Sequence, residues 1–272
     1  MRTKVIAVIE VVIVFGLTMG LMALVILSPI GEWERQVTEY PFIEYAVMIA
    51  VPLLLLVITR RKLTAYGLSF HNISYHLNIA LTAFVPAAIA LSFLAFVNYK
   101  QWMGALLMAV VQIALLFVLG WLLRKKPTQN ENNPLAGSII LIAYSSLLQK
   151  GSFGYAISGL VFYLLFLAFG EELLFRGYIQ SRLNIAWGRP FQFYGVNWGW
   201  GLIITCVIFG LMHVINLYGF LIGDWHPMWA WGFWTFFGGL VFGFIREKTG
   251  SIFASTLLHG LPQGIYTAFF GG

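Results

Sequence analysis

The sequence predicts an all-α, polytopic membrane protein, built as a bundle of eight transmembrane helices, or nine if one short apolar stretch also crosses. Apolar residues make up 60% of the 272-residue chain and charged residues only 10%, against about 25% charged in soluble domains. Long apolar runs alternate with short polar connections. Such a chain has too little polar surface for a soluble fold. The apolar runs must therefore face lipid or one another.

Each apolar run has a length suited to a membrane helix, which needs about 20 mainly apolar residues. Helices are favoured because backbone groups in lipid must be paired within their own segment, and the runs lack the alternation of a membrane barrel. The first run resembles a signal peptide, but it is too long and Leu27-Ser28-Pro29 is a poor cleavage site. The predicted spans are 5–27, 42–59, 78–98, 103–123, 153–172, 199–217, 228–245 and 251–270.

Basic residues lie mainly at the ends of these runs. They are typical of topology signals and headgroup contacts rather than of a nucleic-acid groove, although the net charge is +6. The positive-inside rule places 60–62 and 124–126 in the cytoplasm and the acidic connection 28–41 outside. It also predicts a cytoplasmic position for Arg182, Arg189, Arg246 and Lys248. The basic residues of both halves can all be cytoplasmic only if the chain crosses the membrane once more between 126 and 151. The stretch 135–148 could be this short ninth span, or it could be an interfacial helix.

We divide the chain into an N-terminal part and a catalytic part within one integral membrane domain. Residues 1–150 are predicted to hold membrane helices and interfacial segments such as 60–77, whereas 151–272 form the catalytic core. The single cysteine, Cys206, excludes an intrachain disulfide. No internal repeat is evident, so an inverted-repeat transporter has no direct support.

Charged side chains inside an apolar run cost roughly 2.5–3.5 kcal/mol each on insertion, so they usually serve a function or a specific pairing. Glu171, Glu172 and Arg176 follow an apolar run. The i,i+4 spacing places Glu172 and Arg176 on one helix face, where they can pair. Glu171 points elsewhere and is left without this partner, which suits a general base. The alternative is that the three residues mark a helix end at the interface.

Two later runs each carry a histidine. His213 follows Phe209 by one helical turn, and His259 precedes Gln263 by one turn with Pro262 between them. His259 and Gln263 therefore project from one face and could hold a developing oxyanion. The structural alternative for each is a polar contact between helices. Three separate helices with such groups favour a catalytic site over three unrelated contacts.

The other three histidines do not belong to this pattern. His71 and His76 lie in a predicted interfacial segment, and His226 sits beside Asp224 in a connection. We expect all three to be solvated surface residues.

The three motifs resemble those of the CAAX protease and bacteriocin-processing (CPBP, Abi-like) family of intramembrane glutamate proteases. That family carries EExxxR, FxxxH and HxxxN on successive membrane helices. Here the first motif begins at Glu171, the second runs from Phe209 to His213, and the third begins at His259. The resemblance covers about 160–270. It departs from the family at Gln263, where asparagine is usual.

The resemblance implies a role for each site residue. Glu171, assisted by His213, would activate a water molecule for attack on a peptide carbonyl. His259, with Gln263 in place of asparagine, would stabilise the oxyanion, while Glu172 and Arg176 would support the site. We expect no cofactor. If the enzyme needs zinc, the ligands would be Glu172, His213 and His259, although the chain has no HExxH motif.

By this resemblance, we expect a hydrolase that cleaves near the C-terminus of a membrane-associated or prenylated protein. Its partners would be that substrate and the lipid bilayer, without nucleic acid. In a prokaryote it would lie in the cell membrane with the catalytic side toward the cytoplasm. One alternative is a catalytically weak member acting in bacteriocin self-immunity or as a scaffold. Another is a proton-coupled transporter whose buried Glu and His residues relay protons.

Overall fold

The computed structural model describes residues 2–69, 71–124 and 153–270. In the N-terminal part the elements are α1 (Arg2–Ile26), α2 (Pro29–Thr38), α3 (Phe42–Ile58), η1 (Leu63–Tyr66), α4 (Ile73–Ser92), η2 (Phe93–Ala95) and α5 (Trp102–Leu122). The C-terminal part begins with α7 (Phe153–Val161), η3 (Phe162–Ala168), α8 (Phe169–Glu171), η4 (Glu172–Gln180) and α9 (Ser181–Trp187). It continues with β1 (Phe191–Phe193), β2 (Val196–Trp198), α10 (Trp200–Ile215), α11 (Leu217–Leu221), α12 (Trp229–Thr249) and α13 (Phe253–Phe270).

The prediction of a helical membrane protein is confirmed in its class. Four of the described helices are long and apolar enough to cross a membrane: Arg2–Ile26, Ile73–Ser92, Trp102–Leu122 and Ile157–Trp187. The helices Phe42–Ile58 and Trp200–Ile215 are apolar but shorter. Helices α12 and α13 match the last two predicted runs; α12 is rich in Trp and Gly and ends in charged residues, and α13 contains several polar residues. The stretch proposed as a ninth span, 135–148, lies outside the described residues.

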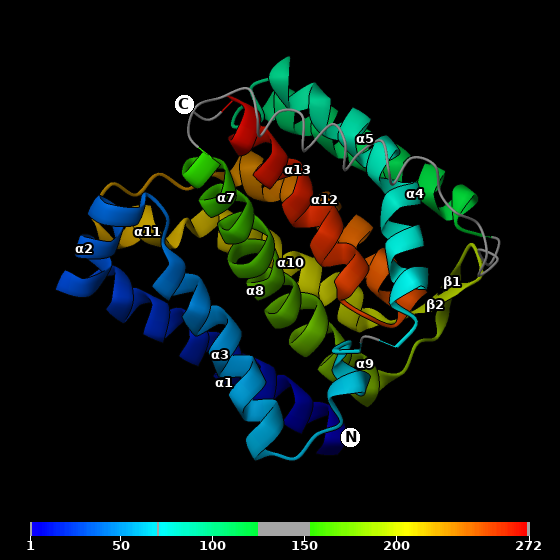
Figure 1. The fold of residues 1–272 in the computed structure, drawn as a ribbon. Coiled ribbons are helices and arrows are strands. Elements are labelled where there is room, and N and C mark those ends of the chain that lie inside the picture. The colour runs from blue at the N-terminus through cyan, green and yellow to red at the C-terminus, as the bar shows by residue number, and fades with distance from the viewer. Residues whose placement is uncertain (1, 70, 125–152, 271–272) are drawn as a thin grey trace.

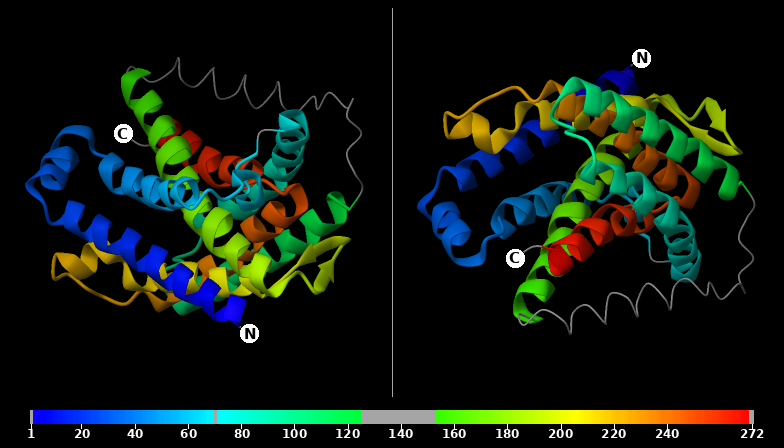
Figure 2. Two further views of the ribbon diagram at one scale, coloured as in Figure 1. Left: turned by 90° about the horizontal axis from the view of Figure 1, so that it is seen from below. Right: turned by 90° about the horizontal axis from the view of Figure 1, so that it is seen from above.

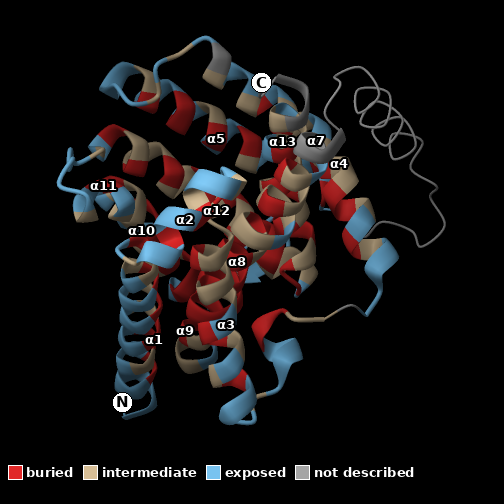
Figure 3. Cartoon of the chain, turned by 60° about the vertical axis from the view of Figure 1, so that its left-hand side comes forward, coloured by how far each residue is buried: buried red, intermediate tan, exposed pale blue. Residues whose placement is uncertain are grey.

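The elements from α7 to α9 follow one another as a single helical rod through the middle of the bundle (Figures 1 and 2). Helices α1 and α3 pair with each other on one side of this rod, while α10 and α12 pair on another. Helix α13 packs along the first half of the rod, and α4 and α5 lie outside α13 and α12. Much of the rod is therefore surrounded by other helices, and residues 170–181 are all buried (Figure 3).

Two small elements differ from the expectation of helices joined by irregular loops. Helix α2 forms within the predicted connection 28–41, where Ser28 caps it by accepting a hydrogen bond from the Gly31 N–H at 3.1 Å, with Pro29 in the first turn. The strands β1 and β2 form an antiparallel hairpin in which Phe191 pairs with Trp198. This hairpin turns at Tyr194 and Gly195, both with positive φ.

The basic residues of both parts gather at one end of the bundle, as the positive-inside rule requires. Arg61, after α3, and Arg182, on α9, both pair with Glu10 of α1. Arg189 pairs with Glu247 near the end of α12. Gly120, near the end of α5, adjoins the Tyr194 ring of the hairpin at the same end. Arg61, Arg182, Arg189 and the end of α5 therefore lie at the same end of the bundle.

The start of the rod lies at the opposite end of the bundle. Gly159 of α7 adjoins Tyr40, which precedes α3, and Thr267 near the end of α13. Figure 1 likewise shows α7 beside the C-terminus and away from the N-terminus. Helix α5 therefore ends at the basic end of the bundle, whereas α7 begins at the opposite end.

Arg246, near the end of α12, is buried and hydrogen-bonded to the rod. Its side chain is buried at 3% exposure and donates to the Ser181 hydroxyl at 2.8 Å. The neighbouring Glu247 accepts from Gln180 at 2.7 Å and from Asn184 at 2.8 Å. These bonds tie the end of α12 to the rod just beyond Arg176. Arg246 therefore lies at the basic end of the bundle, but its side chain contacts the rod instead of facing outward.

Candidate active site

The EExxxR motif lies within the rod rather than at the end of a membrane helix. Glu171 is the last residue of α8 and Glu172 is the first of η4, and the helix continues for fifteen further residues to Trp187. The alternative that these charges mark an interfacial helix end is therefore wrong, as is the predicted end of the span at 172. Both carboxylates are buried, Glu171 at 4% and Glu172 at 0% exposure.

The backbone around the motif is π-helical on both sides, over Phe162–Ala168 and Glu172–Gln180. Such wide turns are rare and often occur at functional sites. Glu171 and Glu172 themselves keep ordinary helical backbone angles, with φ of −65° and −64°. The two carboxylates therefore leave the helix in different directions, and what they share must come from a neighbouring helix.

Glu172 and Arg176 form an ion pair that is fully enclosed. The Arg176 Nη1 donates to the Glu172 Oε1 at 3.0 Å, and both side chains are 0% exposed. The guanidinium also lies 4.4 Å from the centre of the Phe209 ring and donates to the Gly239 carbonyl at 3.4 Å. At Gly239 helix α12 approaches closely: a Cβ there would lie 3.2 Å from the Cys206 Sγ and 3.3 Å from the Arg176 Nη2, so a larger residue would need these neighbours to shift. The predicted pairing is confirmed.

His259 joins the two carboxylates. Its Nδ1 lies 3.2 Å from the Glu172 Oε1, and its Nε2 lies 3.6 Å from the Glu171 Oε2. The α-helical spacing predicted that Glu171 would have no partner. The structure shows that His259 is its partner. The reason is tertiary: α13 packs against the first half of the rod and places a histidine in reach of both carboxylates. A buried chain of charges results, running from Arg176 through Glu172 and His259 to Glu171.

Helix α3 of the N-terminal part closes the Glu171 side of this chain. The backbone carbonyl of Tyr45 would lie 3.5 Å from a Cβ at Gly170, the residue before Glu171. The Tyr45 ring makes an edge contact with Phe162 of the rod, and α3 packs against α8. The N-terminal part thus contributes a wall of the site, a contribution that the motif pattern did not indicate.

His213 occupies a neighbouring position. Its Nδ1 lies 2.8 Å from the Phe209 carbonyl, and its ring makes edge contacts with Phe209 and, at 5.0 Å between centres, with Trp231. Among the described residues, no hydrogen bond or ion pair joins His213 to Glu171, whose ion-pair partner is His259. The direct assistance of His213 to Glu171 remains a prediction.

Gln263 lies one turn beyond His259 on α13, and its side chain is exposed in the described part of the chain. The i,i+4 relation to His259 holds along the helix, but the structure does not bring the Gln263 amide into the buried chain of charges. Its proposed role therefore depends on a bound substrate reaching this exposed face.

The zinc alternative fits this arrangement poorly. The Glu172 Oε1 is taken by Arg176 and His259, and His213 directs Nδ1 to a backbone carbonyl. Among the residues that the structure describes, no group of three His, Cys, Asp or Glu side chains is placed to hold a metal ion. Glu172, His213 and His259 thus do not form a ligand set here.

Of the remaining three histidines, two are exposed and one is buried. His226 is exposed beside Asp224, with 3.4 Å between the Nε2 and the carboxylate, as expected of a surface residue. His71 is exposed as well. His76 is buried at 4% exposure, with its Nε2 3.0 Å from the His71 carbonyl, so its predicted surface position is wrong.

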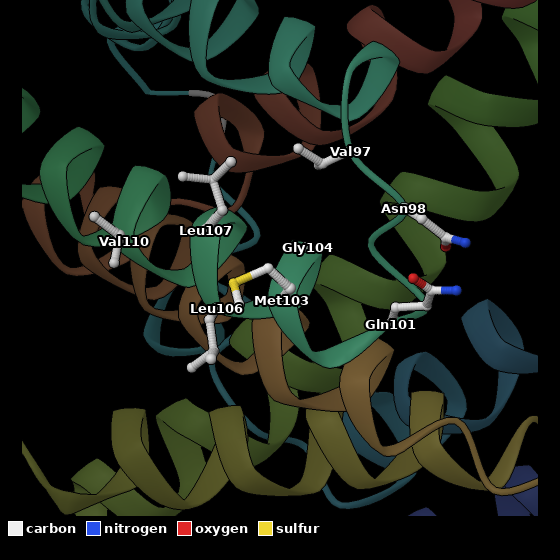
Figure 4. A pocket seen from close by; sticks show the side chains of 8 residues that line it. All are labelled: Val97, Asn98, Gln101, Met103, Gly104, Leu106, Leu107 and Val110. Carbon is white, nitrogen blue, oxygen red and sulfur yellow. The ribbon is translucent and has the colours of Figure 1, made fainter.

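A hollow of about 510 Å³ lies away from these groups, where the connection after α4 meets the start of α5 (Figure 4). Its lining is apolar apart from Asn98 and Gln101. It contains no acidic or histidine side chain. The hollow is therefore separate from the buried chain of charges.

Sequence reasoning missed three residues that the structure connects to this site or to its frame. Phe242 stacks on His259, the Tyr45 carbonyl lies beside Gly170, and Glu10 pairs with Arg182 near the far end of the rod. Glu10 offered a signal, since it is a carboxylate inside the first apolar run. Phe242 and Tyr45 offered none, because aromatic residues are abundant throughout the chain.

Comparison with known families agrees with the three motifs. Residues 153–264 match the family model described as type II CAAX prenyl endopeptidase, Rce1-like. Searches of curated proteins and of solved structures found no match. The matched segment contains Glu171, Glu172, Arg176, His213 and His259, and it ends just after Gln263. The resemblance to the CAAX-type peptidase family is thus confirmed over the segment that builds this site, 153–264.

Proposed function

We propose that the protein is an intramembrane endopeptidase of the CAAX type. It would hydrolyse a peptide bond near the C-terminus of a membrane-associated or prenylated protein. The observation that carries the proposal is the position of His259, whose two ring nitrogens face two buried carboxylates from consecutive residues. A histidine fixed in this way beside a carboxylate is suited to move a proton at a defined place.

In the proposed reaction, Glu171 acts as the general base. The 3.6 Å between its Oε2 and the His259 Nε2 suits a water molecule held by both groups better than a direct hydrogen bond. Glu171 takes one proton from this water while the oxygen attacks the carbonyl carbon of the substrate. The carbonyl electrons move to the oxygen, and the resulting oxyanion is stabilised by hydrogen-bond donors.

The second step returns the proton. The C–N bond breaks, and the proton held by Glu171 passes to the departing nitrogen, so that a carboxylic acid and an amine are released. His259 is the proposed oxyanion donor, together with Gln263, and His213 is the proposed assistant of Glu171. Glu172, held by Arg176, accepts from the His259 Nδ1 and so directs the Nε2 toward the reacting atoms.

The proposed reaction requires no cofactor, in line with the poor fit of a zinc site. The buried ion pair supplies the orienting role that a metal ion plays in other peptidases. We further propose that the basic end of the bundle lies in the cytoplasm, since the cationic segments of both parts gather there. In a prokaryote this orientation would be that of the cell membrane.

A fluorogenic farnesylated CAAX peptide tests the proposal with the purified protein in detergent. We expect cleavage by the wild type, a loss of about 10²–10⁴-fold in kcat for Glu171→Ala and His259→Ala, and no effect of a chelator. Loss of activity on chelation with recovery on added zinc would overturn the metal-free reaction. Retention of activity in Glu171→Ala would overturn the assignment of the base.

One specific observation favours a second candidate function, that of a catalytically weak immunity or scaffold protein. Gln263 replaces the usual asparagine and is exposed rather than directed into the buried cluster. In this case the wild type would fail to cleave the peptide, and Gln263→Asn would gain activity. Cleavage by the wild type with no gain in Gln263→Asn would exclude this candidate.

A further inference from the structure

The plane of the His259 ring is defined by contacts that no sequence motif contains. At the ring edge, its Nδ1 lies 3.2 Å from Glu172 and its Nε2 faces Glu171 at 3.6 Å. Edge contacts alone leave both faces of an imidazole open, so the ring could tilt about the line that joins its partners. Any such tilt would change the direction of the Nε2.

Phe242 of α12 covers one face of this ring. The two ring centres are 4.7 Å apart and the planes diverge by only 16°, which is a stacked arrangement. Phe209 of α10 approaches at a ring-centre distance of 6.4 Å and an interplanar angle of 86°, so it makes an edge contact. Phe242 is thus the residue that sets the plane, whereas Phe209 only limits the space beside it.

The same two phenylalanines hold the other end of the buried chain of charges. The Arg176 guanidinium lies 4.4 Å from the Phe209 ring centre and 5.4 Å from that of Phe242. A cation over an aromatic face is attracted to the ring, and the attraction is stronger where water is excluded. Phe242 therefore contacts both the histidine and the arginine that flank Glu172 in the chain.

The backbone of α12 fixes where the Phe242 side chain can go. Gly239, three residues before, accepts a hydrogen bond from Arg176, and Gly243, directly after, accepts one from Gln180 at 3.2 Å. At both glycines α12 lies close to the rod, since a Cβ at Gly243 would be 3.1 Å from the Gln180 Oε1 and one at Gly239 would be 3.3 Å from the Arg176 Nη2. The position of Phe242 is therefore tied to the rod that carries Glu171 and Glu172.

From these contacts we infer that Phe242 is a positioning residue of the peptidase: its ring holds the His259 imidazole in the plane that directs the Nε2 toward Glu171. The inference rests on the proposed function for its catalytic consequence, but the stacking itself is independent of it. Phe242 acts through His259 and touches none of the proposed reacting atoms.

The first test compares Phe242→Leu, Phe242→Tyr and Phe237→Leu in the peptide assay. Leucine keeps apolar volume but removes the ring, whereas tyrosine keeps the ring. Phe237 lies on the same helix and stacks edge-on with Phe233 and Phe236 instead of His259. We expect kcat to fall about 10- to 100-fold in Phe242→Leu, since small misplacements of a catalytic group have effects of this size.

The expected KM of Phe242→Leu is that of the wild type, and Phe242→Tyr and Phe237→Leu should both keep a wild-type kcat. Equal losses in Phe242→Leu and Phe237→Leu would overturn the inference, because they would indicate a general packing effect. An unchanged kcat in a folded Phe242→Leu protein would also overturn it.

The second test needs no activity. In protein labelled with ¹³C at the histidine Cε1, the ring current of Phe242 should displace the His259 signal, which a His259→Gln variant assigns. We expect Phe242→Leu to move that signal and Phe237→Leu to leave it in place. An unmoved signal would overturn the stacking. If the wild type cleaves no peptide but the signal moves, the proposed function fails while the placement of His259 by Phe242 stands.

Discussion

The two parts of this membrane protein bury charged side chains in different ways. In the N-terminal part, ion pairs lie near helix ends: Arg35 with Glu44 at 3.0 Å, and Glu10 with Arg61 at 2.9 Å, the arginines being about one-quarter exposed. In the C-terminal part, Glu172 and Arg176 pair in the middle of a helix with no exposure at all. A fully enclosed pair is weak support for stability. The N-terminal ion pairs join neighbouring helices, whereas the Glu172–Arg176 pair lies beside His259 in the candidate site.

The parts also differ in what their helix surfaces contact. Helix α1 exposes an apolar stripe along much of its length, including Val5, Ile9, Val12 and Ile13, and buries only six of its 25 residues (Figure 3). The segment η4 has all nine residues buried. The surface of α1 can contact lipid, whereas the surface of η4 is covered by neighbouring helices. Substitutions in matched pairs, one in each part, can test this difference.

The largest expected difference concerns two buried glutamates. Glu171→Gln should lower kcat for the CAAX peptide by about 10²–10⁴-fold, because glutamine keeps the shape but cannot accept the proton. Glu44→Gln, in α3, should leave kcat near the wild-type value, because Glu44 is paired with Arg35 away from the reacting atoms. Initial rates at saturating peptide measure both. A comparable loss in the two variants would contradict a site confined to the C-terminal cluster.

The next difference concerns two arginines. Arg176→Met leaves Glu172 buried without its cation, so we expect the free energy of unfolding to fall by about 3–5 kcal/mol. Arg61→Met removes a partly exposed partner from Glu10, which keeps Arg182, and should cost about 1 kcal/mol or less. Denaturant unfolding in detergent micelles, followed by tryptophan fluorescence, measures both changes.

A double variant serves as the control for this measurement. Replacing both members of the buried pair, as Glu172→Leu with Arg176→Met, should recover much of the stability while leaving the peptidase inactive. If Arg176→Met destabilises no more than Arg61→Met, the pair is solvated and the contrast between the two parts fails.

A smaller difference concerns two glycines in helices. A Cβ at Gly232 of α12 would lie 2.3 Å from the Val214 side chain and 2.5 Å from the Gly210 carbonyl, so Gly232→Ala should lower the unfolding free energy by about 1–3 kcal/mol. A Cβ at Gly20 of α1 meets nothing within 4 Å. Gly20→Ala should therefore be neutral or stabilising by about 0.5–1 kcal/mol. The same micelle unfolding experiment applies, and a stabilising Gly232→Ala would show that α10 and α12 are farther apart.

The sequence by itself determined the class of the protein and the identity of its chemistry-bearing residues. Apolar runs must become helices in lipid because their backbone groups have no other partners. The residues Glu171, His213 and His259 stood out because charged or titratable groups in such runs are costly. Spacing along one helix was sufficient to pair Glu172 with Arg176, since this contact is local.

Only the tertiary structure decided which groups meet between helices. The packing of α13 against the rod brings His259 to both carboxylates, although α-helical spacing alone leaves Glu171 unpartnered. The exposure of Gln263, the burial of His76 and the stacking of Phe242 depend on helix positions that no local pattern contains. Helices of similar hydrophobicity can pack in many ways in lipid. Their small residues and buried polar contacts decide the arrangement, and those contacts exist only after the chain has folded.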